Sequence, residues 1–428
     1  MSLNFINKFV DKHIFNRQRA GDFVYMVSQI TAPVVGFLTS IIVAKYLLPY
    51  ELGIIQTVML IATYCSFFHF GVFNGLNRNI AFYDAQQNKS KIQDMVNASW
   101  LTAILNSFIG IMVSFITLIY FVLNGYPNLY IYSVAILLGI LTFSPICTHY
   151  DTIYRGCRAF MPLGILLNIS NGVNLIFGFL PIFFGALGLI IRSALLPILN
   201  FLLLYRKSPI KHNARGRIDE VRNLASVGFP MLITGILYIF FTAADRTIVA
   251  LSLGPTAVGE LALSGMIISA IQVLPMSMGA LLYPRAAYIF GSSKTSSGLR
   301  KFFYYSLAFN FVTIIPLCLM TYFLIGPLTE RFLPNYVKGI EAAKIYALGS
   351  IFLSSFGVSI IIPVVRRNIP LMIGYAGAIL ILWGLGLALV HKGFGIEGVA
   401  WARFIASAFI CVFTLSYSYY LTTLDIKS

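Results

Sequence analysis

The sequence predicts an all-α polytopic membrane protein whose twelve transmembrane helices form two six-helix bundles. Three observations predict this fold class: an apolar composition, twelve long apolar runs, and a repeat of the first six runs in the last six. Of the 428 residues, 58% are hydrophobic and 10% are charged, and the mean hydropathy is +0.85. Soluble domains average about 45–50% apolar and about 25% charged residues. The composition therefore excludes a soluble enzyme, a disordered chain and a disulfide-stapled secreted fold.

Each apolar run of about 20 residues is a candidate transmembrane helix. The loops between the runs are short and leave no room for a soluble catalytic domain, so we expect that the protein is not an enzyme. The five cysteines form no C-x-x-C pair, so neither a disulfide framework nor a metal site is indicated. The twelve runs fall near residues 23–44, 53–75, 96–122, 130–150, 161–184, 186–205, 224–250, 257–283, 302–325, 343–363, 369–390 and 395–420.

Residues 1–21 precede the first run and lack the small-residue cleavage site of a signal peptide. Leu3, Ile6 and Val10 recur at helical spacing, and Lys8 and Lys12 occupy the other face. This pattern predicts a short amphipathic helix that lies on the membrane surface.

Basic residues indicate the orientation of the chain. With twelve spans both termini lie on one side, and if that side is the cytoplasm, its segments hold 22 of the 30 Lys and Arg residues while the outer loops hold 5. Cytoplasmic loops of membrane proteins carry such an excess of positive charge. We therefore expect cytoplasmic N- and C-termini. The same bias explains most of the formal net charge of +16 without a nucleic-acid partner.

The chain contains an internal repeat. A basic cytoplasmic linker, 206–222, separates a bundle expected at 22–205 from a second expected at 223–428. Parallel repeats related by a pseudo-two-fold axis along the membrane normal are a transporter architecture, with the substrate site at the repeat interface. Three matches support the repeat, namely Ala44–Gly53 with Ala250–Gly259, Asn77–Asn79 with Pro284–Ala286, and Phe184–Arg192 with Phe394–Arg403.

Three arginines lie inside predicted spans at similar depth in the outer half of the membrane: Arg192, Arg246 and Arg403. A charge at mid-bilayer costs roughly 2.5–3.5 kcal/mol on insertion scales, so such residues are functional candidates. A guanidinium binds phosphate through two parallel hydrogen bonds, and these residues predict a cationic cavity for an anionic headgroup. The alternative, that each arginine reaches the interface or pairs with a carboxylate, stays open.

Other residues have supporting roles in this interpretation. Arg78 and Arg285 occupy equivalent positions at the inner ends of spans 2 and 8 and are candidates for receiving the headgroup, or are positive-inside anchors. Proton or ion uptake is assigned to Asp245, Asp151 and Glu260, with helix-end solvation as the alternative for the last two. Pro33 and Pro230, in the first span of each half, are candidate hinges, because proline interrupts helical hydrogen bonds.

Residues 291–298 are rich in glycine and serine but lack the G-K-[ST] order of a P-loop. Nucleotide hydrolysis is therefore not expected, and a gradient of an ion or of the substrate must supply the energy.

The sequence resembles the polysaccharide exporters of the multidrug/oligosaccharidyl-lipid/polysaccharide superfamily, in particular bacterial O-antigen flippases. The resemblance covers nearly the whole chain, although its motifs are loose. Lipid II flippases of the same superfamily usually have fourteen spans, which counts against that assignment. The matching segments are Gly228–Pro230, Asp245–Val249, Gly254–Pro255, Gly259–Glu260, Leu274–Pro275, Tyr283–Arg285 and Gly393–Ala400.

The resemblance implies that undecaprenyl-diphosphate-linked oligosaccharide moves from the cytoplasmic to the periplasmic leaflet of a bacterial inner membrane by alternating access. It implies a cationic lumen, for which Arg246 and Arg78 are the candidates, and it leaves coupling to H⁺ or Na⁺ open. The expected partners are the lipid-linked substrate, membrane lipids, and a polysaccharide polymerase with other assembly proteins.

Three alternatives remain. A multidrug or cation extruder of the same superfamily needs carboxylates in its cavity, and Asp245 is the clear intramembrane carboxylate beside three arginines. A membrane scaffold without transport leaves the repeat and the intramembrane arginines unexplained. A membrane-embedded glycosyltransferase normally has a large outer loop or acidic catalytic motifs, and neither is visible in the sequence.

Overall fold

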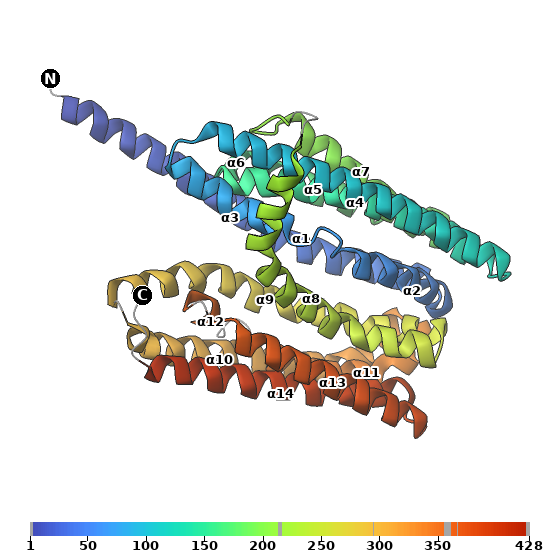
Figure 1. The fold of residues 1–428 in the computed structure, drawn as a ribbon. Helices are drawn as coiled ribbons and strands as arrows, with labels where there is room; N and C mark the ends of the chain where they lie inside the picture. Colours follow the sequence, from blue (N-terminus) through green and yellow to red (C-terminus); the bar gives the residue numbers. More distant parts are fainter. Residues whose placement is uncertain (1–2, 213–215, 294, 355–360, 366, 425–428) are drawn as a thin grey trace. The chain divides into compact units, whose positions relative to one another are not determined.

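The computed structural model is helical throughout the part of the chain that it describes, as Figure 1 shows, and it confirms the predicted fold class. Backbone is described for residues 3–212, 216–293, 295–354, 361–365 and 367–424. Within these ranges, side chains are described except at residues 3–19, 81, 85, 276–281, 283–285, 287–288, 291–293 and 363. Ten of the described helices are long and apolar enough to cross a membrane, and the protein is a multi-pass membrane protein.

The first half of the chain follows the predicted spans with two differences. The predicted surface helix and the first span are a single helix, and the second span is broken between two helices. The helices are α1 (Leu3–Tyr46), α2 (Pro49–Cys65), α3 (Val72–Ala85), α4 (Lys89–Leu123), α5 (Asn128–Gly156), α6 (Phe160–Phe177) and α7 (Leu180–Arg206).

The break in the second predicted span has a local cause. Residues 66–71 form turns between the two helices, and Phe70 and Gly71, directly before α3, have φ angles of 47° and 83°, which lie in the left-handed region and interrupt the helix. Gly71 also lies against the backbone of α8: a Cβ atom at this position would be 2.6 Å from the carbonyl carbon of Gly228. Only glycine meets both demands, and the apolar run 53–75 gives no sign of the break.

The second half has the same character. Two short 3₁₀ helices lie between its long helices. The run predicted at 343–363 contains α11 and α12, and residues 355–360 lie outside the described part. The elements are α8 (Ile218–Ser252), α9 (Pro255–Ser293), η1 (Ser296–Leu299), α10 (Arg300–Phe332), η2 (Pro334–Gly339), α11 (Ile340–Leu353), α12 (Ile361–Val364), α13 (Ile369–His391) and α14 (Gly395–Thr423).

The helices pack with their small polar faces inward, as membrane helices do. Along α4, Ser107 and Gly110 lie against α5: the Ser107 hydroxyl donates to the Thr142 carbonyl at 2.6 Å. A Cβ atom on Gly110 would be 2.6 Å from the Leu141 carbonyl oxygen. The opposite face of α4 exposes large apolar side chains such as Phe115 and Ile119. The exposed surface is therefore suited to contact with lipid.

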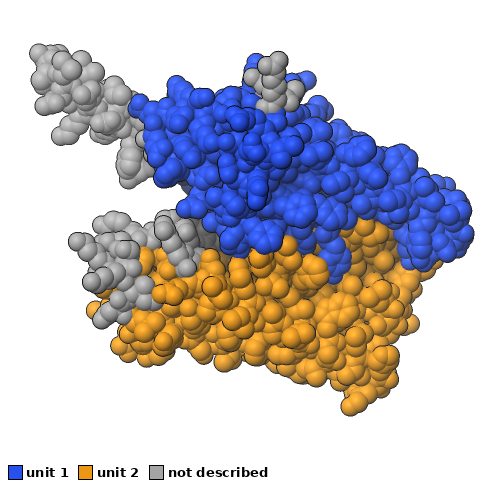
Figure 2. Space-filling view, in the orientation of Figure 1, with its two compact units in different colours: residues 1–35, 64–232 blue, residues 36–63, 233–428 orange. Residues whose placement is uncertain are grey.

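The chain forms two compact units, coloured separately in Figure 2. Unit 1 comprises residues 1–35 and 64–232, and unit 2 comprises residues 36–63 and 233–428. Their composition differs from the division at the 206–222 linker, because each half of the sequence contributes a segment to the other unit. Three helices cross the division: α1 changes unit after residue 35, α2 near its end after residue 63, and α8 after residue 232.

Each unit has its own apolar core. In unit 1, α3, α4, α5 and α6 contribute fully buried side chains that include Leu76, Met95 and Ile153. In unit 2, α8, α9, α13 and α14 contribute Ile248, Val258, Leu382 and Val399, among others.

Unit 2 also contains a close contact between the two copies of the repeated motif. A Cβ atom on Gly53 would be 1.7 Å from the Pro255 carbonyl oxygen, and one on Gly259 would be 1.8 Å from the Pro49 carbonyl oxygen. Equivalent glycines thus contact equivalent prolines at the starts of α2 and α9. The matching residues seen in the sequence are therefore the residues through which these helix ends meet.

Candidate functional site

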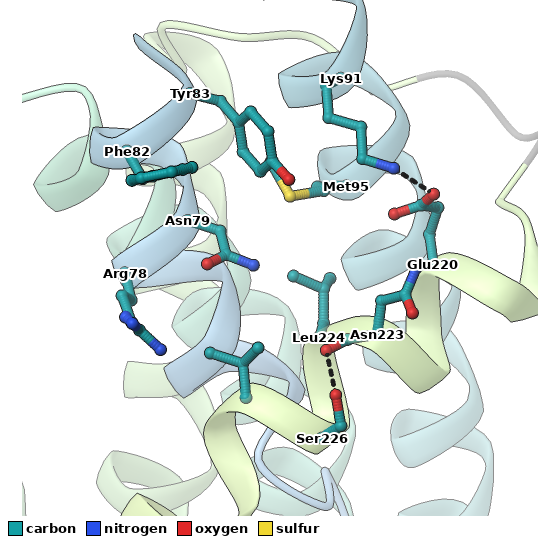
Figure 3. A pocket seen from close by; sticks show the side chains of 11 residues that line it. Arg78, Asn79, Phe82, Tyr83, Lys91, Met95, Glu220, Asn223, Leu224 and Ser226 are labelled. Atoms are coloured by element: carbon teal, nitrogen blue, oxygen red, sulfur yellow. Dashed lines mark hydrogen bonds and ion pairs between the residues drawn. The ribbon is translucent and has the colours of Figure 1, made fainter. Parts of the chain in front are cut away.

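A polar pocket of about 340 Å³ lies within unit 1, at the cytoplasmic end expected for α3 (Figure 3). Its walls come from one face of α3, the first two turns of α4 and the first turns of α8. Helical spacing places the contributing residues of each helix on one side. The lining consists of Arg78, Asn79, Phe82, Tyr83, Lys91, Met95, Glu220, Asn223, Leu224, Ser226 and Val227.

The two cations of this pocket differ in whether they have an ion-pair partner among the described residues. Lys91 Nζ is 2.6 Å from Glu220 Oε1, so these two charges neutralise each other. No hydrogen bond or ion pair from the described residues reaches the exposed side chain of Arg78 or the amide of Asn79. Two cations and one carboxylate leave a formal charge of +1. The pocket therefore presents an unpaired guanidinium and an unpaired amide to a ligand.

Aromatic and amide groups complete the walls. Phe82 and Tyr83 pack edge to face with ring centroids 5.2 Å apart. In Figure 3 the amides of Asn79 and Asn223 lie on opposite sides of the pocket. Amides donate and accept hydrogen bonds, and ring faces provide apolar contact area. Cations, amides and rings in one pocket suit a ligand that carries both phosphate and polar, ring-shaped groups.

The sequence-predicted residues are distributed over both units. Arg78 lines the pocket, whereas the side chain of its repeat partner Arg285, in α9, lies outside the described residues. Arg192 in unit 1 is half-buried, and its Nε and Nη2 both donate to Asn174 Oδ1, at 3.0 and 2.9 Å. Arg246 and Arg403 belong to unit 2.

Arg403 is buried inside unit 2, where the structure brings it to Asp245. Its Nη1 is 3.8 Å from Asp245 Oδ2 and donates to the Phe241 carbonyl at 2.5 Å. The guanidinium also lies 4.2 Å from the centre of the Phe241 ring. The Tyr346 hydroxyl donates to the same Asp245 oxygen at 2.7 Å. These contacts join α8, α11 and α14 in one buried polar cluster.

Arg246 has different surroundings from its neighbour in sequence. Its backbone N–H donates to Asp245 Oδ1 at 2.7 Å, while its side chain is exposed. The side chain lies over Gly265 of α9, where a Cβ atom would be 2.8 Å from Arg246 Nη2. Adjacent residues point about 100° apart on a helix, which separates the buried carboxylate from the exposed guanidinium.

The remaining predicted residues are at helix ends or within helices. Asp151 pairs with Arg155 one turn later at 2.7 Å. Glu260 is half-buried in the second turn of α9. Pro33 and Pro230 lie inside α1 and α8. Both prolines stand two residues before the point at which their helix passes from one compact unit to the other.

An aromatic cluster in unit 1 contacts the linker, and no sequence motif predicts it. His212 of the linker stacks on Trp100 with ring centroids 3.6 Å apart, and its Nδ1 is 3.3 Å from the Tyr150 hydroxyl. Burial lowers the pKa of His212, so its neutral form is favoured there. Beneath it, His149 Nδ1 is 2.9 Å from the Ser99 hydroxyl.

The pocket residues beyond Arg78 also went unpredicted. Lys91 and Glu220 stand far apart in the sequence, each at a helix start where charges are ordinary. The repeated segment Asn77–Asn79 is the sequence feature that points to this pocket, because Arg78 and Asn79 form part of its wall.

The sequence profile of a family described as "Polysaccharide biosynthesis protein" matches residues 19–290. No curated protein matches the sequence significantly. An inward-facing multidrug resistance MATE family transporter of the MOP superfamily has a TM-score of 0.75 at 12% identity, over 93% of this chain and 98% of that chain. The lipid II flippase MurJ, in an inward closed conformation, has a TM-score of 0.69 at 18% identity, over 92% and 87%.

A third structure is a MOP superfamily transporter from Pyrococcus furiosus, described as having a binding pocket of reverse polarity. It has a TM-score of 0.64 at 12% identity, over 95% of this chain and 96% of that chain. At such low identities these structures establish a shared fold.

Proposed function

The chain belongs to the polysaccharide biosynthesis protein family, and from this premise we propose that it is a flippase for lipid-linked oligosaccharide. The substrate class is an oligosaccharide on undecaprenyl diphosphate, such as an O-antigen repeat unit. The direction is from the cytoplasmic to the periplasmic leaflet of a bacterial inner membrane. Solved proteins with this fold include multidrug transporters and a lipid II flippase, which supports a transport role.

Translocation of a diphosphate-linked oligosaccharide requires a polar, positively charged binding site. A diphosphate and its sugars do not cross hydrocarbon unaided, because charged and polar groups lose their hydration there. The polyprenyl tail stays in lipid throughout. The protein must therefore offer the headgroup a polar route whose groups replace water.

One observation carries the proposal: Arg78 and Asn79 have no side-chain partner among the described residues, and they lie in a pocket that also contains Lys91. A guanidinium donates two parallel hydrogen bonds to phosphate oxygens, and an amide binds a sugar hydroxyl in either direction. A drug or cation extruder, the alternative within the fold, needs net negative charge in its pocket. Here the pocket charge is positive, and the buried carboxylate of Asp245 already has Arg403 and Tyr346 as partners.

The intramembrane arginines have separate roles in this proposal. Arg246 is exposed and is assigned to the headgroup during translocation. Arg192 adds a guanidinium in unit 1 that is already oriented by Asn174. Arg403 holds Asp245 in the core of unit 2 and contributes through that carboxylate.

Coupling to H⁺ or Na⁺ belongs to the proposal as well. Asp245 is the best-placed of the three carboxylates, because it is buried and its partners connect three helices. Asp151 is held by Arg155, and Glu260 has a less buried position. Transport into vesicles with an imposed proton or sodium gradient tests the coupling, and equal rates with and without both gradients would contradict it.

The experiment for the substrate uses Arg78→Ala and Arg246→Ala. Each variant is expressed in cells whose surface polysaccharide depends on this chain, with Arg206→Ala as the matched control, since Arg206 is exposed at the end of α7. We expect at least a tenfold loss of surface polysaccharide and accumulation of lipid-linked oligosaccharide on the inner leaflet. Normal polysaccharide with both variants at normal expression would reject the proposal. Export of cationic dyes by the wild-type protein, without export of polysaccharide, would favour the multidrug or cation extruder.

A further inference from the structure

The ion pair in the pocket has an unusual position. Lys91 stands in the first turn of α4 and Glu220 in the first turn of α8, directly after the linker between the halves of the sequence. The Lys91 side chain is 32% exposed and the Glu220 side chain 11% exposed. Both residues line the pocket, and Lys91 is the more accessible of the two. Figure 3 shows both on the wall opposite Arg78.

A diphosphate needs more positive charge than the resting pocket offers. Its two phosphoryl groups carry at least two negative charges at neutral pH, and Arg78 is the one cation of the pocket without a described partner. Lys91 is the second cation. Its ammonium group has three N–H donors, and one of them donates a hydrogen bond to Glu220. The Lys91 side chain is about a third exposed, so solvent screens its attraction to the buried Glu220, and a phosphate of higher charge competes for the lysine.

We propose that the Lys91–Glu220 pair is an exchangeable latch within a diphosphate site. A diphosphate bound by Arg78 takes Lys91 from Glu220, and the first turn of α8 loses its ion pair with α4. This inference rests on the proposed function and names the second cation of its headgroup site. Glu220 acts as an internal competitor that occupies Lys91 when the site is empty.

The rest of α8 limits how far the change spreads. The carbonyl of Leu224 lies where a Cβ atom on Gly75 would be 2.1 Å away, and Gly228 lies equally close to Gly71. These backbone contacts hold α8 on α3 from residue 224 onward. At the end of the linker, Gly216 contacts α4, since a Cβ atom there would be 2.7 Å from the Asn97 carbonyl oxygen. Release of Glu220 therefore loosens residues 218–223, between these two sets of contacts, and leaves the remainder of α8 packed.

Binding to the purified full chain in detergent tests the exchange, with inorganic pyrophosphate, inorganic phosphate and polyprenyl diphosphate as probes in calorimetric titrations. Lys91→Gln is expected to weaken pyrophosphate binding about tenfold, and Glu220→Gln to strengthen it several-fold. Adding Glu220→Gln to Lys91→Gln is expected to change nothing further, because the competitor acts only through Lys91. Both substitutions nearly preserve side-chain volume, at the partly exposed Lys91 and at the buried Glu220.

The matched control is Glu341→Gln. Glu341 pairs with Lys344 at 2.7 Å in unit 2 and does not line the pocket of unit 1, so pyrophosphate binding is expected to stay unchanged. Three results would overturn the latch: no gain of affinity in Glu220→Gln, the same gain with Lys91 absent, or inorganic phosphate binding as tightly as pyrophosphate. The last result would mean that one cation suffices.

Hydrogen–deuterium exchange provides the conformational readout. Pyrophosphate is expected to speed exchange in residues 218–223 of the wild-type chain, and Glu220→Gln to do so without ligand. Unchanged or slower exchange would also overturn the latch. Failure of the proposed function gives a different pattern: pyrophosphate binds with the expected dependence on Lys91 and Glu220, but no lipid-linked oligosaccharide crosses vesicles that contain the protein.

Discussion

The role of Asp245 depends on the residues that contact it in the folded protein. In the sequence it adjoins Arg246, although neighbouring residues on a helix point about 100° apart and need not pair. The structure turns the Arg246 side chain outward and gives Asp245 to Arg403 and Tyr346. The carboxylate is only 4% exposed. A buried charge of this kind is stable only while its partners remain.

Replacement of Arg403 by methionine is therefore expected to destabilise the protein by about 3–5 kcal/mol, the usual cost of removing one partner of a buried ion pair. The neutral side chain leaves Asp245 without its counter-charge. The melting temperature of the purified protein in detergent measures the effect. Adding Asp245→Asn removes the stranded charge and is expected to restore a large part of the loss. A melting temperature for Arg403→Met equal to that of the wild type would contradict the pairing.

The helix ends of α2 and α9 illustrate the scale of whole elements. Proline at the first position of each helix suits its start, because that residue has no N–H to satisfy within the helix. Four residues later each helix has a glycine, and the two glycines allow the backbones to touch. A repeat in the sequence has thus become a symmetric contact between elements.

Gly53→Ala tests this contact. The added methyl group would lie 1.7 Å from a backbone oxygen that cannot rotate away, so the helix ends must separate. Overpacking of this kind typically costs about 1–3 kcal/mol. We expect a lower melting temperature and impaired polysaccharide export. The matched control is Gly36→Ala, since nothing lies within 4 Å of a Cβ atom at Gly36. Equal behaviour of the two variants would argue against a close contact.

At the scale of the whole molecule, the compact units do not coincide with the halves of the sequence. Two long helices, α1 and α8, each begin in unit 1 and end in unit 2. Their changes of unit follow Pro33 and Pro230 by two residues in both cases. A proline removes one helical hydrogen bond and eases bending at that point. These positions are where a relative movement of the units would bend a continuous helix.

Pro33→Ala and Pro230→Ala are accordingly expected to slow transport several-fold while pyrophosphate binding stays near the wild-type value. The reason is that alanine restores the helical hydrogen bond and stiffens the crossing segment. Transport rates in vesicles, with binding measured on the same preparations, give the comparison. Pro316→Ala is the control, because Pro316 lies inside α10 and entirely within unit 2. If Pro316→Ala slowed transport as strongly as the other two substitutions, the effect would be a general consequence of proline loss and the hinge assignment would be wrong.

The sequence by itself determined the helical membrane class, most of the spans and the repeat, because these depend on local properties. Bilayer thickness sets a required length of apolar chain, and each run can be recognised without reference to the others. It also identified Arg78 as a candidate for the headgroup and Pro33 and Pro230 as candidate hinges.

Only the tertiary structure decided which polar groups meet. It broke the second span at Gly71, joined Asp245 to Arg403, and brought Lys91 to Glu220 beside Arg78. These pairings link residues that are distant in the chain, and their strength depends on burial and on distances of a few ångströms. Neither quantity is a property of a sequence segment, which is why the contents of the pocket emerged only when the helices were packed.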